Sequence, residues 1–352
     1  MKIYIKTYGC TLNQGDSEVL KGIISKEHKI VDSEENADLI IVNTCGVKTT
    51  TQNKIIGYVK KTSEKKKVIV GGCLPSMINI KKYAPKVILT FDTKSTTKIN
   101  EIIKKQKINN KQDTPLGKPR IRTIKETAIV PISEGCLGKP CTYCSVKLAR
   151  GELHSYRKED ITSEVEKGVK EGCNIIKLTA QDTGCWGKDI NDTLPNLLRE
   201  ILKIKGEYKI RLGMMNPNYT LEYLDELIEV YQNPKMIKFL HIPVQSGSDK
   251  VLKDMKRGYT VEEFKKVVGE FRKEIKGVSI ATDFIAGFPT ETEEDFKKTI
   301  QLIKEVRPEV INISMFAPRP KTEAARMKQL KTQTIKERSR KLSEEYKKIK
   351  KA

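Results

Sequence analysis

The sequence predicts an α/β protein, in which an N-terminal parallel α/β sheet domain is followed by a partial TIM-type (β/α)6 barrel. Three observations lead to this prediction. Short apolar runs alternate with polar helical stretches in both parts of the chain, a charged segment separates the two parts, and cysteines or polar residues follow the apolar runs. A length of 352 residues with 38% hydrophobic content is sufficient for two domains.

Four apolar runs in the first part of the chain predict parallel strands with helices between them. The runs cover residues 2–10, 37–45, 66–73 and 85–92. Three of them end in a cysteine, at Cys10, Cys45 and Cys73. The carboxyl ends of parallel strands share one edge of a sheet, where open α/β sheets bind ligands, so these thiols can meet in space. Any one alone could be a buried structural cysteine, but three at one edge favour a ligand site.

Residues 104–126 predict a linker or an extended crossing segment. They are polar and charged, contain Pro115, Gly117 and Pro119, and lack apolar periodicity. The N-terminal domain is therefore expected at residues 1–103.

From Thr127 the alternation resumes in six strand–helix units, which suit a partial barrel at residues 127–320. The expected strands cover residues 127–133, 174–180, 208–214, 237–244, 278–287 and 309–318, and the expected helices lie near 159–172, 193–204, 220–231, 248–274 and 292–306. Active sites of such barrels lie at the carboxyl ends of the strands. Those ends carry Cys136, Gln181, Asp182, Asn216, His241, Gln245, Asp283 and Arg319.

The charge of the chain indicates a polyanionic partner. Lys and Arg total 67 against 45 Asp and Glu, a formal net charge of +22, which favours nucleic acid. A Lys-rich composition spread over all solvated faces would give the same total. Residues 321–352, however, carry twelve Lys or Arg and four Asp or Glu, and predict one basic amphipathic helix. The chain has no run of about 18 apolar residues and no signal peptide, so we expect a cytoplasmic protein without membrane contact.

The strongest local signal is EGCLGKPCTYCSVKLARG, which places Cys136, Cys141 and Cys144 in one loop. Because the cytoplasm keeps thiols reduced, the eight cysteines indicate metal or redox chemistry instead of disulfides. A closed zinc site needs a fourth protein ligand, and the closest histidine, His154, is ten residues beyond Cys144. Three thiolates suit a [4Fe–4S] cluster with one iron left open to a small molecule.

This loop resembles the three-cysteine loop of the radical S-adenosylmethionine superfamily. The resemblance implies a [4Fe–4S] cluster on Cys136, Cys141 and Cys144, chelated at its open iron by the amino and carboxylate groups of S-adenosylmethionine, with Tyr143 beside the adenine. The spacing departs from the usual form, because four residues instead of three separate the first two cysteines. A loop with glycine and proline can absorb one more residue.

Further stretches are similar to the methylthiotransferases of that superfamily. They are TYGCTLNQGDSE, VNTCGV and VGGCLP in the N-terminal part, and LTAQDTGCWGKD, RLGMMNPNY, HIPVQSGSDKVLKDMKRGYT, ATDFIAGFPTETEEDF and MFAPRPKTEAA in the barrel. The resemblance implies that Cys10, Cys45 and Cys73 hold a second [4Fe–4S] cluster that presents sulfur. The first cluster would generate a radical from S-adenosylmethionine, and a second S-adenosylmethionine would methylate the sulfur.

The resemblance also suggests cofactor contacts from polar side chains at the barrel mouth. They are Arg150, Gln181, Asp182, Gln245 and Asp283. Arg150 can pair with the methionine carboxylate. Each of these residues could equally be a hydrogen-bonded barrel residue or a helix cap without a ligand. Cys173 and Cys185 are expected to be packed or exposed thiols instead of ligands.

The TYGCTLNQGDSE and QDTG stretches look most like the archaeal and eukaryotic branch, which acts on N6-threonylcarbamoyladenosine beside the tRNA anticodon. We therefore expect methylthiolation at C2 of that base in the anticodon stem-loop. Isopentenyladenosine tRNA and a ribosomal protein aspartate are alternative substrates, and a non-catalytic Fe–S RNA-binding protein is an alternative class. The family normally ends with a small RNA-binding β-barrel domain, which is expected to be absent because the sequence stops at KKIKKA. The electron donor and the sulfur source are unknown from the sequence.

Overall fold

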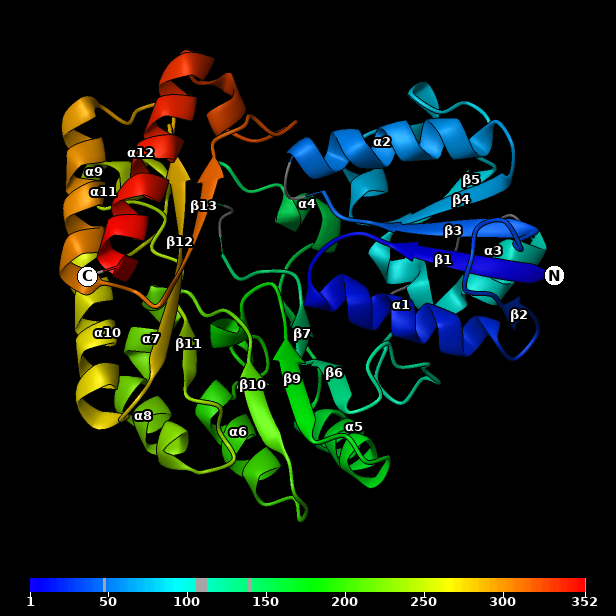
Figure 1. The fold of residues 1–352 in the computed structure, drawn as a ribbon. Coiled ribbons are helices and arrows are strands. Elements are labelled where there is room, and N and C mark those ends of the chain that lie inside the picture. The colour runs from blue at the N-terminus through cyan, green and yellow to red at the C-terminus, as the bar shows by residue number, and fades with distance from the viewer. Residues whose placement is uncertain (47–48, 106–112, 139–140, 352) are drawn as a thin grey trace. The chain divides into compact units, whose positions relative to one another are not determined.

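The computed structural model describes residues 1–46, 49–105, 113–138 and 141–351 (Figure 1). The chain forms two compact units. The first comprises Met1–Cys136, Ser145–Gln181 and Ile204–Tyr208, and the second Leu137–Cys144, Asp182–Lys203 and Lys209–Ala352. The first unit joins the N-terminal sheet to the first two expected barrel strands, and the domain bounds given above remain a proposal. Residues 106–112 of the expected linker and 139–140 of the cysteine loop lie outside the described residues.

Five parallel strands form the N-terminal sheet of the first unit, in the order β2-β1-β3-β4-β5. The strands are β1 (Lys2–Thr7), β2 (Lys29–Ile30), β3 (Leu39–Thr44), β4 (Lys67–Gly72) and β5 (Leu89–Thr90), with helices α1 (Thr11–Ile24), α2 (Thr49–Ser63) and α3 (Ile99–Lys105). The four strands expected from the apolar runs are present. The two-residue strand β2 is too short to produce a pattern in the sequence.

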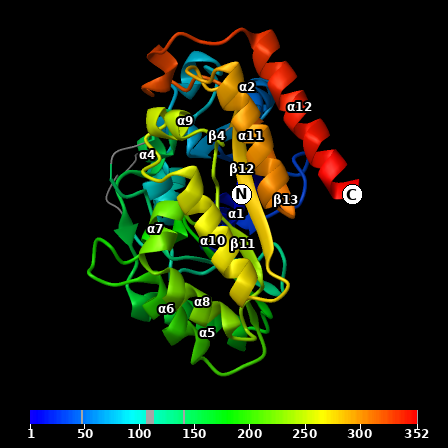
Figure 2. The same cartoon turned by 90° about the vertical axis from the view of Figure 1, so that its left-hand side faces the viewer.

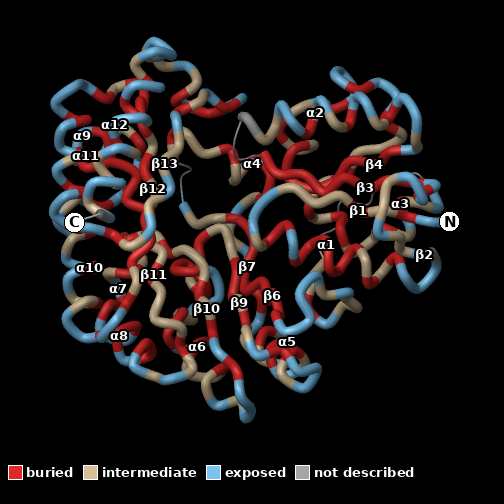
Figure 3. Tube along the Cα trace, in the orientation of Figure 1, coloured by how far each residue is buried: buried red, intermediate tan, exposed pale blue. Residues whose placement is uncertain are grey.

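Helices cover both faces of this sheet. On one face α2 places Ile55 and Val59 against Ile40 of β3. On the other face α1 places Leu20 against Ile41, because successive side chains of a strand point to opposite faces. Figure 3 shows β3 and β4 buried along most of their length. A strand covered on both faces reads as a continuous apolar run, which is the form of the LIIV stretch in β3.

The first unit also contains the first two strands of the expected barrel. β6 (Thr127–Pro131) pairs in parallel with β9 (Ile175–Thr179), and β7 (Ser133–Glu134) pairs antiparallel with β8 (His154–Ser155). Helices α4 (Val146–Arg150) and α5 (Lys158–Lys170) lie between them in the chain. The described part of the linker packs closely on α1, since a Cβ added to Gly22 would lie 2.3 Å from the backbone of Pro119.

The second unit contains the later barrel strands and their helices. These are β10 (Lys209–Leu212), β11 (Phe239–His241), β12 (Ser279–Ala286), β13 (Val310–Met315), α6 (Leu194–Leu202), α7 (Pro217–Glu222), α8 (Leu224–Gln232), α9 (Asp249–Asp254), α10 (Val261–Glu274), α11 (Glu293–Val306) and α12 (Thr332–Lys351). β11, β12 and β13 pair in parallel, and Figure 2 looks onto α10, α11 and α12, which cover them. Two expected helices are interrupted. One breaks at Tyr223, and the other after Met255, where Lys256 and Gly258 have positive φ.

The expected basic C-terminal helix is α12, and it is docked on the second unit. Ile335 packs so closely on Gly287 that an added Cβ there would lie 2.6 Å from Ile335 Cγ1. Arg338 is buried, and its guanidinium pairs with Glu291 at 3.2 Å and Glu293 at 3.3 Å. The helix is thus held by both apolar and ionic contacts.

The buried carboxyl of Glu291 makes the stability of this unit sensitive to pH. Burial raises the pKa of Glu291 from 4.5 to about 7, although Arg338 favours the charged form. A carboxyl with a raised pKa in the folded state loses stability as the pH rises from its unfolded to its folded pKa. Relative to Glu291→Gln, we therefore expect the free energy of unfolding of the native chain to fall by about 2–3 kcal/mol between pH 4.5 and 7.

Chemical denaturation at several pH values measures this difference. The matched control is Glu293→Gln, because Glu293 pairs with the same Arg338 but is 57% exposed. It should follow the native chain through this pH window. Parallel curves for the native chain and Glu291→Gln would contradict the prediction.

No helix in the described part of the chain is long and apolar enough to cross a lipid bilayer.

Candidate functional site

The N-terminal trio, Cys10, Cys45 and Cys73, lies just beyond the carboxyl ends of three adjacent strands of the first unit. β3 is flanked by β1 and β4, and each strand ends one to three residues before its cysteine. The Cys73 amide donates to the Thr44 carbonyl at 2.9 Å, and a Cβ added to Gly9 would lie 2.8 Å from the Cys45 Cβ. The placement expected from the parallel pattern is therefore present in the fold.

Buried amide side chains hold the loops that carry this trio. Asn13 Nδ2 donates to the Thr44 carbonyl at 2.9 Å, and Asn43 Nδ2 donates to the Asn13 carbonyl and to Ser17 Oγ, both at 2.9 Å. The Cys10 thiol donates to Asn13 Oδ1 at 3.4 Å. Sequence reasoning did not single out Asn13 or Asn43, although both lie within the TYGCTLNQ and VNTC stretches.

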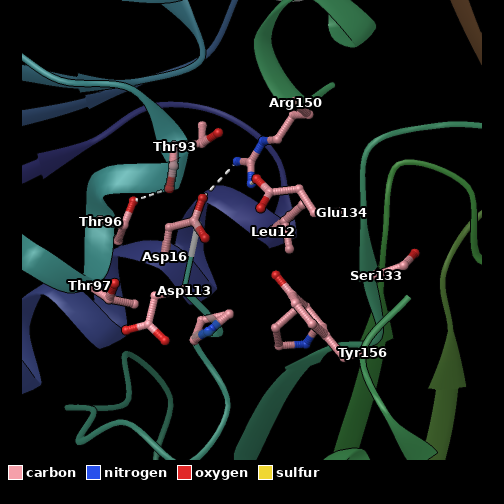
Figure 4. Close-up of a pocket in the computed structure, with 12 residues that line it drawn as sticks. Leu12, Asp16, Thr93, Thr96, Thr97, Asp113, Ser133, Glu134, Arg150 and Tyr156 are labelled. Atoms are coloured by element: carbon pink, nitrogen blue, oxygen red, sulfur yellow. Dashed lines mark hydrogen bonds and ion pairs between the residues drawn. The ribbon is translucent and has the colours of Figure 1, made fainter. Parts of the chain in front are cut away.

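Arg150 is the charged residue closest to this trio. Its side chain is buried, with Nη2 at 2.7 Å from Asp16 Oδ2, Nη1 at 2.9 Å from Glu134 Oε1 and Nε at 3.4 Å from Cys73 Sγ. Figure 4 shows the guanidinium turned toward the two carboxylates. Burial raises the pKa of the Cys73 thiol, and Arg150 opposes that rise. The structure thus places Arg150 beside the N-terminal trio, and its expected contact with the methionine carboxylate stays a prediction.

The first residue of the loop trio (Cys136, Cys141 and Cys144) follows a glycine that no other residue can replace without strain. Gly135 has φ +78°, and an added Cβ would lie 1.9 Å from the Glu152 carbonyl oxygen. Its amide donates to Gln181 Oε1 at 2.6 Å. Gln181 therefore fixes the backbone next to Cys136, and its expected cofactor contact is untested by this hydrogen bond.

Cys141 and Cys144 lie in the second unit, in a turn closed by the Cys144 amide, which donates to the Cys141 carbonyl at 2.9 Å. Arg257, buried in the stretch MKRGYT, donates from Nη1 to Cys141 Sγ at 3.3 Å and from Nε to Tyr259 Oη at 3.0 Å. Arg257 was not singled out from the sequence, because its contact with Cys141 is formed only by the fold. Its position five residues or fewer from the glycine-containing turn after α9 gave no local signal.

Tyr143, between these two cysteines, packs against an apolar cluster. The cluster includes Met255, Phe288 and Phe316 of the second unit. Burial raises the pKa of Tyr143 well above its usual value, so the ring carries a neutral hydroxyl. Its expected place beside an adenine remains a prediction.

Asp182 serves as a helix cap in the structure. Its carboxylate is buried and accepts from the amides of Gly184 at 3.0 Å and Asn216 at 3.1 Å. Burial raises its pKa to about 6, and the two amide donors limit that rise. Two of its acceptor positions are thus used by the backbone, and a cofactor contact would need the remaining ones.

Gln245 and Asp283 meet through their backbones in the second unit. The Gln245 amide donates to the Asp283 carbonyl at 2.8 Å, and Gln245 has a positive φ of 72°. The Asp283 carboxylate lies 3.0 Å from His241 Nε2 and accepts from Asn312 Nδ2 at 2.7 Å. Asp283 was expected at the end of its strand, but it lies in the middle of β12, because this strand continues to Ala286.

Cys173 and Cys185 are packed thiols. Both are buried, and they donate to the carbonyls of Lys125 and Asp182, respectively, at 3.3 Å. Among the residues that the structure describes, no three His, Cys, Asp or Glu side chains close around a single metal ion. Thiols spread over three strand ends instead fit a cluster, in which each ligand binds its own iron atom, and soft thiolates are the ligands that Fe–S clusters select.

Comparison with known proteins agrees with this reading of the fold and the cysteines. Residues 130–303 match the radical SAM superfamily, and residues 2–92 match an uncharacterized protein family, UPF0004. The radical S-adenosylmethionine methyltransferase TsrM from Kitasatospora setae, with cobalamin and a [4Fe–4S] cluster bound, superposes with a TM-score of 0.64 at 13% identity, over 92% of this chain and 74% of its own. The cobalamin-dependent radical enzyme OxsB gives 0.60 at 14% identity, over 99% and 56%. The α/β fold with a partial barrel is thereby confirmed, and the class is that of radical S-adenosylmethionine proteins.

Curated relatives narrow the class further. A probable threonylcarbamoyladenosine tRNA methylthiotransferase of Pyrococcus horikoshii is 43% identical, over 97% of this chain and 82% of its own length. The corresponding protein of Methanocaldococcus jannaschii is also 43% identical, over 96% and 81%. The threonylcarbamoyladenosine tRNA methylthiotransferase of Drosophila melanogaster is 37% identical, over 97% and 65%. This chain belongs to the threonylcarbamoyladenosine tRNA methylthiotransferase family.

Proposed function

We propose that this chain inserts a methylthio group at C2 of N6-threonylcarbamoyladenosine in tRNA. The observation that supports this proposal best is the N-terminal trio, which gathers at the carboxyl edge of a parallel sheet in a chain that also carries the loop trio. A radical enzyme that inserts no sulfur needs only the loop trio. The second trio therefore favours sulfur insertion over other radical reactions.

The cofactors of this family are two [4Fe–4S] clusters and S-adenosylmethionine, which supply the radical and sulfur chemistry that an unreactive adenine C–H bond requires. We assign one cluster to Cys10, Cys45 and Cys73, and the other to the loop trio. The chain's own residues orient these groups. Gln181 holds the loop before Cys136, and the amides Asn13 and Asn43 hold the loops of the N-terminal trio.

The remaining cofactor contacts are assigned from the positions of polar side chains. Tyr143, Asp182, Gln245 and Asp283 are the candidates for S-adenosylmethionine. Asp283 is the most open of the carboxylates among them, since its side chain is 28% exposed and already ordered by His241. A carboxylate held in this way can accept a hydrogen bond from a ribose hydroxyl or an amino group.

The partner is proposed to be the anticodon stem-loop of tRNA, and the location the cytoplasm. The net charge of +22 favours a phosphate-rich partner over a protein loop. α12 adds exposed cations at Lys336, Arg340, Lys341, Lys347, Lys348 and Lys350. The electron donor and the sulfur source are not assigned.

The substrate is tested by mass spectrometry of nucleosides. The reconstituted full chain is incubated anaerobically with reductant, sulfide, S-adenosylmethionine and tRNA that carries threonylcarbamoyladenosine. A 2-methylthio product is expected. Release of 5′-deoxyadenosine without that product would redirect the proposal to isopentenyladenosine tRNA or a ribosomal protein aspartate, and the absence of both would favour a non-catalytic Fe–S protein.

A further inference from the structure

Arg150 is fixed by carboxylates from two separate elements of the first unit. Asp16 belongs to α1 and Glu134 to β7, and the guanidinium pairs with both at 2.7 and 2.9 Å. Arg150 itself ends α4 and is 4% exposed. A planar guanidinium gripped by two carboxylates cannot rotate, so the direction of its third N–H group is set.

That third group points at a cysteine of the N-terminal trio. Arg150 Nε donates to Cys73 Sγ at 3.4 Å. Cys73 is 5% exposed, and Arg150 pairs with it across 77 residues of sequence. Of the three donor directions of this side chain, two are used to hold it and one reaches the thiol.

A purely stabilising role explains this arrangement poorly. Removing one guanidinium and two carboxylates from water is costly, and buried ion pairs often contribute no more than apolar residues of equal volume. The cavity beside the network has a volume of about 10 Å³, enough for about one water molecule (Figure 4). The charges are thus shielded from bulk solvent, where an N–H group affects a nearby sulfur most strongly.

We propose that Arg150 is a positioning residue of the cluster on the N-terminal trio, and that its Nε–H group stabilises negative charge on the Cys73 sulfur. Hydrogen bonds to ligand sulfurs help to set the reduction potential of Fe–S clusters, and groups that hold a metal ligand in place increase metal retention. Arg150 therefore raises the reduction potential of this cluster and slows its loss of iron. This inference rests on the proposed second cluster, but not on the tRNA substrate.

The test uses the full chain with Cys136, Cys141 and Cys144 replaced by alanine, so that only the N-terminal cluster is reconstituted. In this parent, Arg150→Gln is compared with Arg157→Gln, whose arginine is exposed and pairs only locally with Asp160. Iron and sulfide per chain, the electron paramagnetic resonance spectrum of the reduced cluster, its midpoint potential and the rate of iron loss to a ferrous chelator are measured. For Arg150→Gln we expect a more negative potential, an altered spectrum and iron loss about 10-fold faster or more. Arg157→Gln should match the parent.

A second variant covers the case in which Arg150→Gln does not fold. Asp16→Asn keeps the arginine and removes one of its two carboxylate partners, so it should shift the potential in the same direction by a smaller amount. If Asp16→Asn and a folded Arg150→Gln match the parent in potential and iron loss, the proposal is overturned.

The predicted methionine-carboxylate contact is tested in parallel. In a chain with Cys10, Cys45 and Cys73 replaced by alanine, Arg150→Gln should bind S-adenosylmethionine as its parent does. Weaker binding there, with an unchanged N-terminal cluster, would overturn the proposal in favour of that contact. A triple-alanine parent without any N-terminal iron would overturn the cluster assignment itself, whatever the substrate is.

Discussion

Replacement of Cys10, Cys45 and Cys73 by alanine is expected to abolish the methylthio product, while S-adenosylmethionine is still cleaved to 5′-deoxyadenosine. The three thiols are the only soft ligands among the described residues at this edge of the N-terminal sheet. The loop trio is supplied by a separate stretch of chain, from Cys136 to Cys144. Loss of the N-terminal cluster should therefore remove sulfur insertion and leave radical formation intact.

Two controls separate this result from a general loss of structure. Cys173→Ala removes a buried thiol from the same unit and should leave both products unchanged, because Cys173 only donates to a backbone carbonyl. Replacement of the loop trio by alanine should abolish both products. Nucleoside mass spectrometry and chromatography of 5′-deoxyadenosine measure the two yields. Methylthio product from the N-terminal triple variant would show that sulfur reaches the base without these cysteines.

Binding of tRNA is expected to weaken by about 10³-fold or more between roughly 50 and 200 mM salt, as counterions released from six or more phosphates are no longer gained at high salt. The net charge of +22 supplies the cations. We expect Lys336→Gln, Lys341→Gln and Lys347→Gln together to reduce the salt slope by about two to three phosphate contacts. All three lysines are exposed on α12.

The matched control removes three exposed lysines elsewhere. Lys61, Lys65 and Lys67 lie near the amino end of β4, opposite the cysteine edge of the N-terminal sheet. Their replacement by glutamine should leave the slope nearly unchanged. Equal effects of the two triple variants would favour a Lys-rich composition without a defined phosphate-binding face. Affinity that barely changes with salt would contradict the prediction altogether.

Much of the fold and the position of both cysteine trios could be predicted from the sequence. Parallel strands between helices are buried on both faces, so runs such as ADLIIVNTC mark the strand and its carboxyl end together. Cys45 and Cys73 were placed at one edge for this reason. The loop trio was evident because its three cysteines lie within nine residues of sequence.

Contacts between distant parts of the chain could not be predicted. Arg150 reaches Asp16 across 134 residues and Arg257 reaches Cys141 across 116, and no local pattern encodes either pair. The expected helix near 248–274 was interrupted because Lys256 and Gly258 adopt positive φ, a backbone choice that apolar periodicity does not reveal. Asp283 was misplaced at a strand end because the alternation in ATDFIAG does not show where pairing stops.

The docking of α12 affects the thermodynamics of RNA recognition. A flexible basic tail would lose about 1–2 kcal/mol of backbone entropy for each residue that it orders on binding. The 20 residues of α12 are already helical, and Arg338, Ile335 and Leu342 hold them on the second unit. Its lysines are therefore preorganised along about 30 Å of rigid helix. Calorimetry of RNA binding should show no large heat-capacity change from folding of this segment.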